Sequence, residues 1–379
     1  MSSKLPPLVA MDVAGRLDRL RAVVSDHGCD ALLVTRPANV RWLTTFAGSN
    51  GQLIVTDREL VAVTDGRYEV EMAERLTEAG VAARVEITVT GLGDILDGAL
   101  PTGAKLGLEA HHVTWQRRDQ VAAWLPGRPL VATTGVVEEL RKVKDGGELA
   151  RLRRAAAIAD RALDEVVPCL GDGLTERAVA RLLDNRMLEL GADEPSYDTI
   201  VAAGPNSARP HAHPTDRPIQ PTDLVVIDVG ARLDGYGSDM TRTFVAGGEP
   251  SDDQRRLYDA VIEAQAEGVA AVAADVEELT VDTVCRAVLA RHHLADAFIH
   301  GTGHGIGLEI HEDPILSQRS AGRLRDGYVV TVEPGVYLPD RGGVRIEDAV
   351  LVTAVGCEPL THSPKTMIPW DRPQQSPSE

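Results

Sequence analysis

The sequence is poor in cysteine, and the four cysteines that it has are widely separated. They are Cys29, Cys169, Cys285 and Cys357, and no two of them form a CxxC pair. In a chain of 379 residues this spacing argues against a disulfide framework and against a zinc site built from cysteines. We therefore expect four reduced thiols, most of them buried.

Long apolar runs are also missing. No stretch approaches the ~20 apolar residues that a membrane-spanning helix needs. The first 21 residues lack the apolar core of a signal peptide, because Lys4, Asp12, Arg16 and Asp18 interrupt them. We therefore expect a cytoplasmic protein with no membrane partner.

Basic side chains are outnumbered by acidic ones. The chain carries 39 Lys and Arg residues against 57 Asp and Glu residues, a net charge of −18 at pH 7. Such a surface repels phosphate backbones, so we expect no nucleic-acid partner. Apolar residues make up 43% and charged residues 25%, which is typical of a soluble globular protein, and the length suggests two or three domains.

Periodicity divides the chain into two parts. Up to about residue 140, helical and strand patterns alternate, which predicts an α/β domain. A polar, glycine-bearing segment at 142–148 marks a boundary. Beyond two long predicted helices, residues 200–250 and 300–350 are rich in glycine, proline and short apolar runs, and a helical block at 251–294 separates them.

Each of these two glycine-rich stretches contains a predicted hairpin that carries two acids. In the first, the apolar run 224–227 leads into Asp228, and Asp239 begins the returning strand, 238–245. Folding at the turn between them brings the two carboxylates close together. Like charges repel strongly where water is excluded, so a positive partner is required, either Arg242 or a metal ion.

The second hairpin repeats the pattern. The apolar run 329–332 ends in Glu333, and Glu347 lies on the predicted return strand, 343–350. Strand alternation puts Arg345 on the same face as Glu347. A single acid of this kind is often only solvated or ion-paired, but four of them in two matching hairpins predict a shared cation site.

A histidine-rich segment between the hairpins supplies nitrogen ligands. His300 and His304 alternate with glycines in HGTGHGIG, and His311 follows closely. A phosphate-binding loop is the competing interpretation, but neither GxxxxGK[ST] nor GxGxxG occurs here. Four carboxylates and an imidazole form a hard, oxygen-rich site that suits Mn²⁺ best, with Co²⁺ or Zn²⁺ as alternatives. Two such cations can share bridging carboxylates and a bridging hydroxide, which acts as the nucleophile.

Several segments together resemble the pita-bread metallopeptidases, and within them the Xaa-Pro dipeptidases (prolidases) and Xaa-Pro aminopeptidases. The segments are VVIDVGA, SDMTRTF, HGTGHGIGLEIHEDP, TVEPGVY and GGVRIED, and the resemblance spans residues 140 to 367. Upstream, residues 39–43, 48–51 and 64–68 resemble the creatinase-like N-terminal domain of these enzymes. The implied organisation is an α/β creatinase-like N-terminal domain (1–140), an α+β pita-bread (creatinase/aminopeptidase-like) catalytic domain (141–368) and a disordered tail (369–379).

The resemblance also implies a role for each site residue. Asp228 would chelate one metal, Asp239 and Glu347 would bridge the pair, and His304 and Glu333 would complete the shell of the other metal. Three residues would take part in catalysis: His211 and His311 beside the substrate, and Glu333 as a proton shuttle. Three more are assigned to substrate binding: His300 and Arg345, at the substrate pocket or just behind the metal ligands, and Tyr337, in a nearby hydrogen-bonding role.

The implied activity is metal-dependent hydrolysis of Xaa-Pro bonds by a metal-bridged hydroxide, with dipeptides favoured as substrates. The alternatives are an aminopeptidase that releases the first residue of longer peptides, a creatinase-like hydrolase that is not a peptidase, and a non-catalytic binding module. The complete ligand set disfavours the last two. The expected partners are a small peptide with proline in second position and a second copy of the chain in a homodimer.

Overall fold

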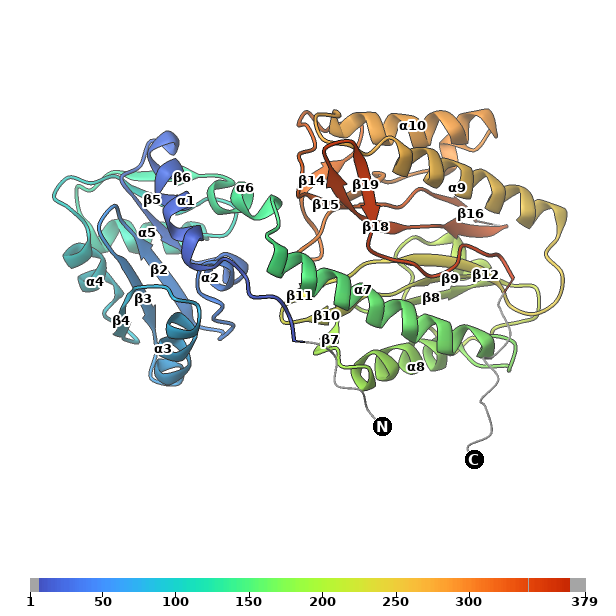
Figure 1. Cartoon of the computed structure of the whole chain (residues 1–379), viewed down its shortest axis with the longest axis horizontal. Helices are drawn as coiled ribbons and strands as arrows, with labels where there is room; N and C mark the ends of the chain where they lie inside the picture. The colour runs from blue at the N-terminus through green and yellow to red at the C-terminus, as the bar shows by residue number, and fades with distance from the viewer. Residues whose placement is uncertain (1–6, 340, 369–379) are drawn as a thin grey trace. The chain divides into compact units, whose positions relative to one another are not determined.

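A computed structural model describes residues 7–339 and 341–368 of the chain. Two compact units are present, one formed by Ala10–Arg141 and the other by Lys142–Glu379 together with Met1–Val9 (Figure 1). The predicted tail, 369–379, lies outside the described residues.

The N-terminal unit is built on a six-stranded mixed sheet with the strand order β4-β3-β2-β1-β5-β6. The neighbours β1, β2 and β3 run antiparallel, and the pairs β3–β4, β1–β5 and β5–β6 run parallel. The strands are β1 (Ala31–Val34), β2 (Gly51–Val55), β3 (Leu60–Thr64), β4 (Arg84–Ile87), β5 (Leu106–Glu109) and β6 (Leu130–Thr133). Every residue of β1 and β3 is buried, as expected for apolar strands covered on both faces.

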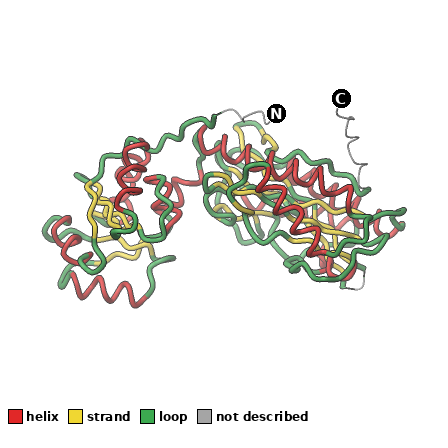
Figure 2. The backbone as a smooth tube through the Cα atoms, turned by 90° about the horizontal axis from the view of Figure 1, so that it is seen from below, coloured by secondary structure: helices red, strands yellow, loops and turns green. Residues whose placement is uncertain are grey.

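Six helices accompany this sheet. They are α1 (Ala14–Val24), α2 (Pro37–Thr44), α3 (Glu69–Glu78), α4 (Leu92–Ala99), α5 (Trp115–Trp124) and α6 (Val136–Lys142). Figure 2 shows helices on either side of the strands in this unit. Helices and strands alternate along this unit, as the sequence predicts for residues up to about 140.

The first half of the C-terminal unit packs two helices on a small antiparallel sheet. The helices are α7 (Gly146–Val166) and α8 (Glu176–Glu189), and the sheet has the order β12-β9-β8, from β8 (Ile200–Ala203), β9 (Leu224–Asp228) and β12 (Thr241–Val245). A capping box fixes the start of α7, because Asp145 accepts from the Glu148 backbone and the Glu148 side chain accepts from the Asp145 backbone. Apolar residues of both helices and of the sheet form one continuous core.

The second half repeats this arrangement. Helices α9 (Asp252–Ala270) and α10 (Glu278–Arg291) cover a sheet with the order β14-β13-β15-β18-β19. Its strands are β13 (Gly303–Gly305), β14 (Glu312–Leu316), β15 (Val329–Val332), β18 (Asp348–Thr353) and β19 (Gly356–Pro359). In Figure 1, α9 and α10 lie on one side of the strands, and α7 and α8 lie on the other.

Short strands complete the C-terminal unit. A three-stranded sheet has the order β11-β10-β7, and a separate pair joins β16 to β17. These strands are β7 (Glu194–Pro195), β10 (Ala231–Leu233), β11 (Tyr236–Gly237), β16 (Gly335–Leu338) and β17 (Gly342–Arg345). The predicted return strand at 343–350 is therefore broken: β17 pairs with β16, and β18 pairs with β15.

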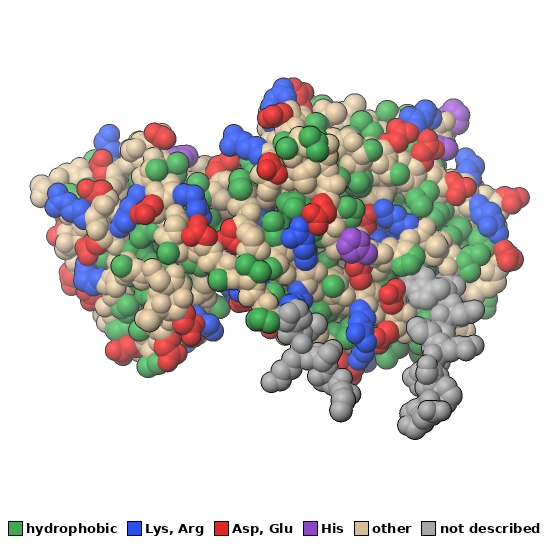
Figure 3. Space-filling model, viewed as in Figure 1, with side chains coloured by type: hydrophobic (Ala, Val, Ile, Leu, Met, Phe, Trp, Pro, Cys, Tyr) green, Lys and Arg blue, Asp and Glu red, His purple; other side chains and the backbone are tan. Residues whose placement is uncertain are grey.

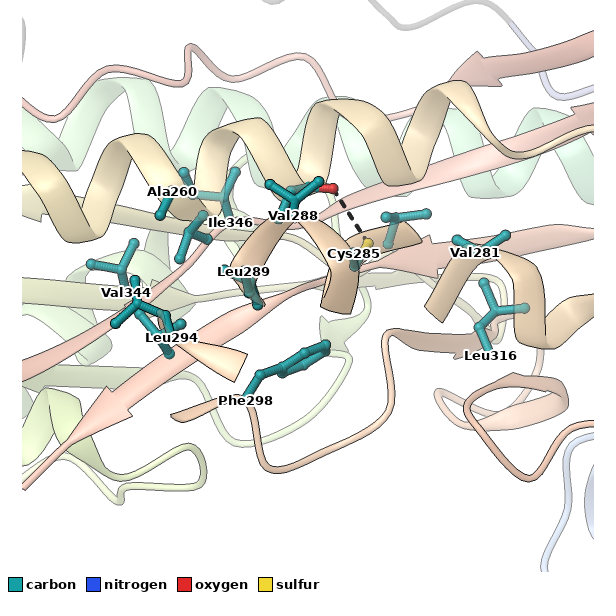
Figure 4. Packing of buried hydrophobic residues seen from close by; sticks show 14 of the residues in the cluster. Ala260, Val281, Cys285, Val288, Leu289, Leu294, Phe298, Leu316, Val344 and Ile346 are labelled. Carbon is teal, nitrogen blue, oxygen red and sulfur yellow. Dashed lines mark hydrogen bonds between the residues drawn. The ribbon is translucent and has the colours of Figure 1, made fainter. Parts of the chain in front are cut away.

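The core beneath α9 and α10 is close-packed and includes a cysteine (Figure 4). The Cys285 thiol is buried among apolar side chains and donates to the Ala264 carbonyl, with a sulfur–oxygen distance of 3.3 Å. All four cysteines are free; Cys29 and Cys285 are buried and the other two are partly exposed. The expectation of reduced thiols stays a prediction, and the expectation that most of them are buried is wrong, because only two of the four are.

Charged side chains of both signs are spread over the face of the molecule drawn in Figure 3, among scattered apolar ones. Among the residues that the structure describes, no helix combines the length and the apolar character needed to cross a membrane.

Replacing Leu289 by alanine should lower the free energy of unfolding by about 2–5 kcal/mol, because this α10 side chain is fully buried and its loss leaves a cavity. The matched change Leu188→Ala on α8, where the side chain is 44% exposed, should cost less than about 1 kcal/mol. Guanidinium unfolding monitored by circular dichroism measures both. Equal losses in the two variants would show that the α9–α10 core is not packed as described.

Candidate active site

The C-terminal unit contains a cavity of about 590 Å³ whose walls come from both of its halves. All the predicted site residues except Tyr337 line it. These lining residues are His211, Asp228, Asp239, His300, His304, His311, Glu333, Arg345 and Glu347.

The first hairpin brings its two acids together as predicted. Asp228 ends β9 opposite Thr241, the first residue of β12, and Asp239 lies two residues before that partner. The hydroxyl of Tyr197 donates to Asp228, and its oxygen lies 2.6 Å from an oxygen of Asp239. Tyr197 thus bridges the pair, and sequence reasoning did not find it.

The second hairpin places Glu333 directly after β15 and Glu347 directly before β18. The last residue of β15, Val332, pairs with Asp348, so Glu333 and Glu347 face each other where the ladder opens. The Thr241 hydroxyl donates to Glu347 at 2.7 Å, and the Glu347 amide donates to the Thr241 carbonyl at 3.1 Å. These two hydrogen bonds join the second hairpin to the first.

His304 lies on β13 beside the acids of both hairpins. Its Nε2 is 3.6 Å from a carboxylate oxygen of Asp239 and 3.4 Å from one of Glu333. Its Nδ1 lies 3.1 Å from the carbonyl oxygen of Gly305, which can only accept, so Nδ1 carries the proton and Nε2 presents its lone pair to the acids. A Cβ at Gly303 would collide with the Thr331 carbonyl, so a glycine is needed for this strand to lie so close.

Arg242, which the sequence offers as a counter-ion for Asp228 and Asp239, does not reach them. It lies opposite Ile227 in the ladder, so strand alternation turns it away from the acids. Its guanidinium is instead 2.8 Å from Asp348 and donates to the Ser363 carbonyl. That alternative is therefore wrong, and Arg345, 2.6 Å from Asp228, is the cation at the site.

The site contains more acidic side chains than permanently basic ones. Among the described lining residues, Arg345 alone has a permanently positive side chain. Burial, reinforced by neighbouring carboxylates, holds the pKa of Asp239 and of Glu347 well above the usual range. Burial also raises the pKa of Glu333 from 4.5 to about 8 and lowers the pKa of His304 from 6.5 to about 4.

This donor set fits divalent cations. Ligand atoms of Asp239, His304 and Glu347 all lie within 4.8 Å of one another. Glu333 adjoins His304, and Asp228 adjoins Asp239 through Tyr197. Carboxylate oxygens with one imidazole nitrogen are hard donors, and positive charge among them would remove the repulsion that raises the acid pKa values.

Tyr337 lies behind the cavity wall and not in it. Its hydroxyl oxygen is 2.8 Å from an amino nitrogen of Arg345 and 3.0 Å from Nε2 of His300. Because Nδ1 of His300 lies 2.8 Å from the Gly301 carbonyl, Nδ1 holds the proton and Nε2 accepts from the tyrosine. The residue therefore positions two wall residues through hydrogen bonds and does not itself line the cavity.

The two histidines expected beside the substrate are exposed at the cavity. His311 packs against His304 with ring centroids 4.3 Å apart in an edge-to-face arrangement. His211 lines the cavity beside Pro210 and Ala212. His213 lines it too, although no motif in the sequence singles that residue out.

The repeated helix-and-sheet halves around an acid-rich centre define a metallopeptidase of the pita-bread type. The chain belongs to Metallopeptidase family M24: residues 150–354 match the pattern of that family. Residues 16–143 match the Creatinase/Prolidase N-terminal domain. The predicted fold class is confirmed.

Proteins similar along nearly the whole chain have related descriptions. The Xaa-Pro dipeptidase of Pyrococcus furiosus is 33% identical over 353 residues, covering 93% of this chain and 99% of the relative. The solved Xaa-Pro dipeptidase from Bacillus anthracis has a TM-score of 0.89 at 35% identity, covering 94% of this chain and 99% of that one. The X-Pro aminopeptidase from Thermotoga maritima has a TM-score of 0.84 at 32% identity, with 93% and 99% covered.

The metal-free chain should lose stability as the pH rises from about 6.5 to 8. The pKa of Glu333 is about 8 when folded and 4.5 ordinarily, so in this window the folded chain holds a proton that the unfolded chain has released. The contribution of this proton to the free energy of unfolding is fully present below pH 4.5 and is lost as the pH rises through 8. Histidines, which titrate near pH 6.5 when unfolded, act mainly below this window.

The check is the melting temperature of the chelator-treated chain across that window. The decrease of melting temperature with pH should become shallower in Glu333→Gln and should stay unchanged in the exposed control Glu358→Gln. With saturating Mn²⁺ this decrease should vanish. A melting temperature that is constant or rises with pH would contradict the assignment.

Proposed function

We propose that this metallopeptidase hydrolyses Xaa-Pro peptide bonds with two divalent cations, Mn²⁺ foremost, held by Asp228, Asp239, His304, Glu333 and Glu347. One observation carries the proposal. Four carboxylates from two hairpins and one imidazole from a third strand converge in a cavity that has a single permanent cation among its described lining residues. Without added positive charge such a cluster is costly, so cation binding is its natural use.

The ligands follow the roles implied by the resemblance. Asp239 and Glu347 would be ligands shared by the two cations, Asp228 would help to hold one, and His304 and Glu333 would help to hold the other. When bound, the two cations would polarise the scissile carbonyl and make a water molecule acidic enough to attack at neutral pH. Tyr197, whose hydroxyl contacts Asp228 and Asp239, orients these carboxylates, as outer-sphere hydrogen bonds generally do at metal centres.

Side chains of the cavity account for proton movement. Glu333 can accept a proton from the attacking water and deliver it to the proline nitrogen, which must be protonated when the peptide bond breaks. His311 and His211, exposed at the cavity, can donate to the oxygen that becomes negative during attack.

The chemistry of the Xaa-Pro bond and the apolar residues of the cavity both support specificity for proline. An Xaa-Pro bond has no N–H to donate, so a site for it needs an apolar surface for the ring and not an acceptor for an amide proton. The lining includes Ile200, Pro210, Ile310 and Ile315. Relatives described as Xaa-Pro dipeptidase and X-Pro aminopeptidase share the proline requirement by name and differ in the length of their substrate. A homodimer and a cytoplasmic location stay predictions from the sequence.

Hydrolysis of Ala-Pro-Ala should disappear after chelation, return with Mn²⁺, and exceed that of Ala-Ala-Ala.

Asp239→Asn should lower kcat/KM by more than about 100-fold and reduce the bound metal, because outer-sphere changes alone cost 10- to 100-fold at metal sites. Steady-state kinetics and elemental analysis measure the two effects, with the exposed Asp216→Asn as control. Full turnover and two bound metals in Asp239→Asn would refute the assignment.

His311→Ala should lower kcat by about 10²- to 10⁴-fold, the usual contribution of a general acid or base, while leaving the metal content unchanged. The exposed His362→Ala provides the matched control. Loss of metal from His311→Ala would place this residue among the ligands instead.

A further inference from the structure

The wall of the cavity beside His304 is apolar. His304 on β13 is directly opposite Ile315 on β14, and residues so paired in an antiparallel ladder point to the same face. Ile315 accordingly lines the cavity, with 43% of its surface exposed. A large aliphatic side chain thus stands in the open cavity next to a proposed metal ligand.

The strand that carries Ile315 is held firmly. Glu312, the first residue of β14, is 2.8 Å from Lys144, and the side chains in this ion pair are 8% and 1% exposed respectively. Removing one partner of a pair this buried is strongly unfavourable, so β14 does not readily leave its place. Ile315 is therefore a fixed part of the wall.

Among the described lining residues, no permanently positive side chain is free to recognise a substrate carboxylate in this cavity. Arg345 is 3% exposed, and its guanidinium donates to Asp228, Thr241, Tyr337 and the Pro210 carbonyl. The exposed acid Asp198 adds further negative charge to the lining. Histidines there can each donate a hydrogen bond, but neutral imidazole supplies no net charge.

The lack of a free positive side chain affects dipeptides more than longer peptides. In an Xaa-Pro dipeptide the carboxylate is attached to the ring carbon next to the scissile nitrogen, so it must enter the cavity with the reacting bond. In a longer peptide the same carbon bears a neutral amide. Desolvating a carboxylate without a counter-ion is much costlier than desolvating an amide.

We propose that Ile315 is a specificity residue that makes this centre select peptides continuing beyond the proline, or otherwise uncharged there, over free Xaa-Pro dipeptides. The inference rests on the proposed Xaa-Pro peptidase function and deepens it. It reverses the preference for dipeptides that the family resemblance alone implies.

Three substrates test the selectivity on the full chain loaded with Mn²⁺: Ala-Pro, Ala-Pro-amide and Ala-Pro-Ala. The first two have nearly the same shape and differ in charge. We expect kcat/KM to be about 10- to 100-fold higher for the amide and the tripeptide than for Ala-Pro, the range set by one uncompensated polar group.

Ile315→Arg tests the residue itself. A long cationic side chain is tolerated at a partly exposed position, and it should raise kcat/KM for Ala-Pro by about tenfold or more while changing that for the amide only slightly. Ile315→Met, which keeps the wall apolar and similar in volume, should retain the wild-type ratio. Metal content and circular dichroism verify that each variant is intact.

The outcomes separate the two proposals. A wild-type preference for Ala-Pro, or an intact Ile315→Arg variant with an unchanged substrate ratio, overturns the selectivity and leaves the Xaa-Pro peptidase function standing. No cleavage of any of the three substrates overturns the proposed function and the selectivity with it.

Discussion

The structure of the C-terminal unit must accommodate the repulsion among the carboxylates at its centre. Two hairpins from the two halves of the unit each deliver a pair of acids to one cavity, where Arg345 is the one permanent cation among the described lining residues. Tyr197 is hydrogen-bonded to Asp228 and Asp239, and Thr241 of the first hairpin is hydrogen-bonded to Glu347 of the second. Each half packs its sheet beneath two helices, so the acids are held by rigid strands and cannot move apart to relieve their charge.

Much of this was predictable because the signals are local. An apolar run that ends in an acid marks a buried strand whose carboxylate emerges at its end, which located Asp228 and Glu333. The histidine-rich segment located His304, and Gly303 is needed beside it because a Cβ there would collide with the Thr331 carbonyl. Helices in both units followed from apolar periodicity, since that pattern depends only on nearby sequence.

The remaining features depend on register and tertiary packing, which a single sequence does not specify. Arg242 faces away from Asp228 because Thr241, not Arg242, is opposite that acid. Tyr197 lies outside any apolar run. Aromatic residues make up only 3% of the chain, and this rarity was the only reason to consider Tyr197 for the site. Tyr337 holds the cavity wall from behind, and Ile315 enters the cavity through a strand pairing that no local pattern specifies.

Anomalous X-ray diffraction from crystals soaked in Mn²⁺ tests the central claim most directly. The account predicts two manganese peaks in the cavity, both bound by Asp239 and Glu347, with His304 on one of them. A cavity without manganese, whose acids are neutralised only by Arg345 and by protons, would contradict it.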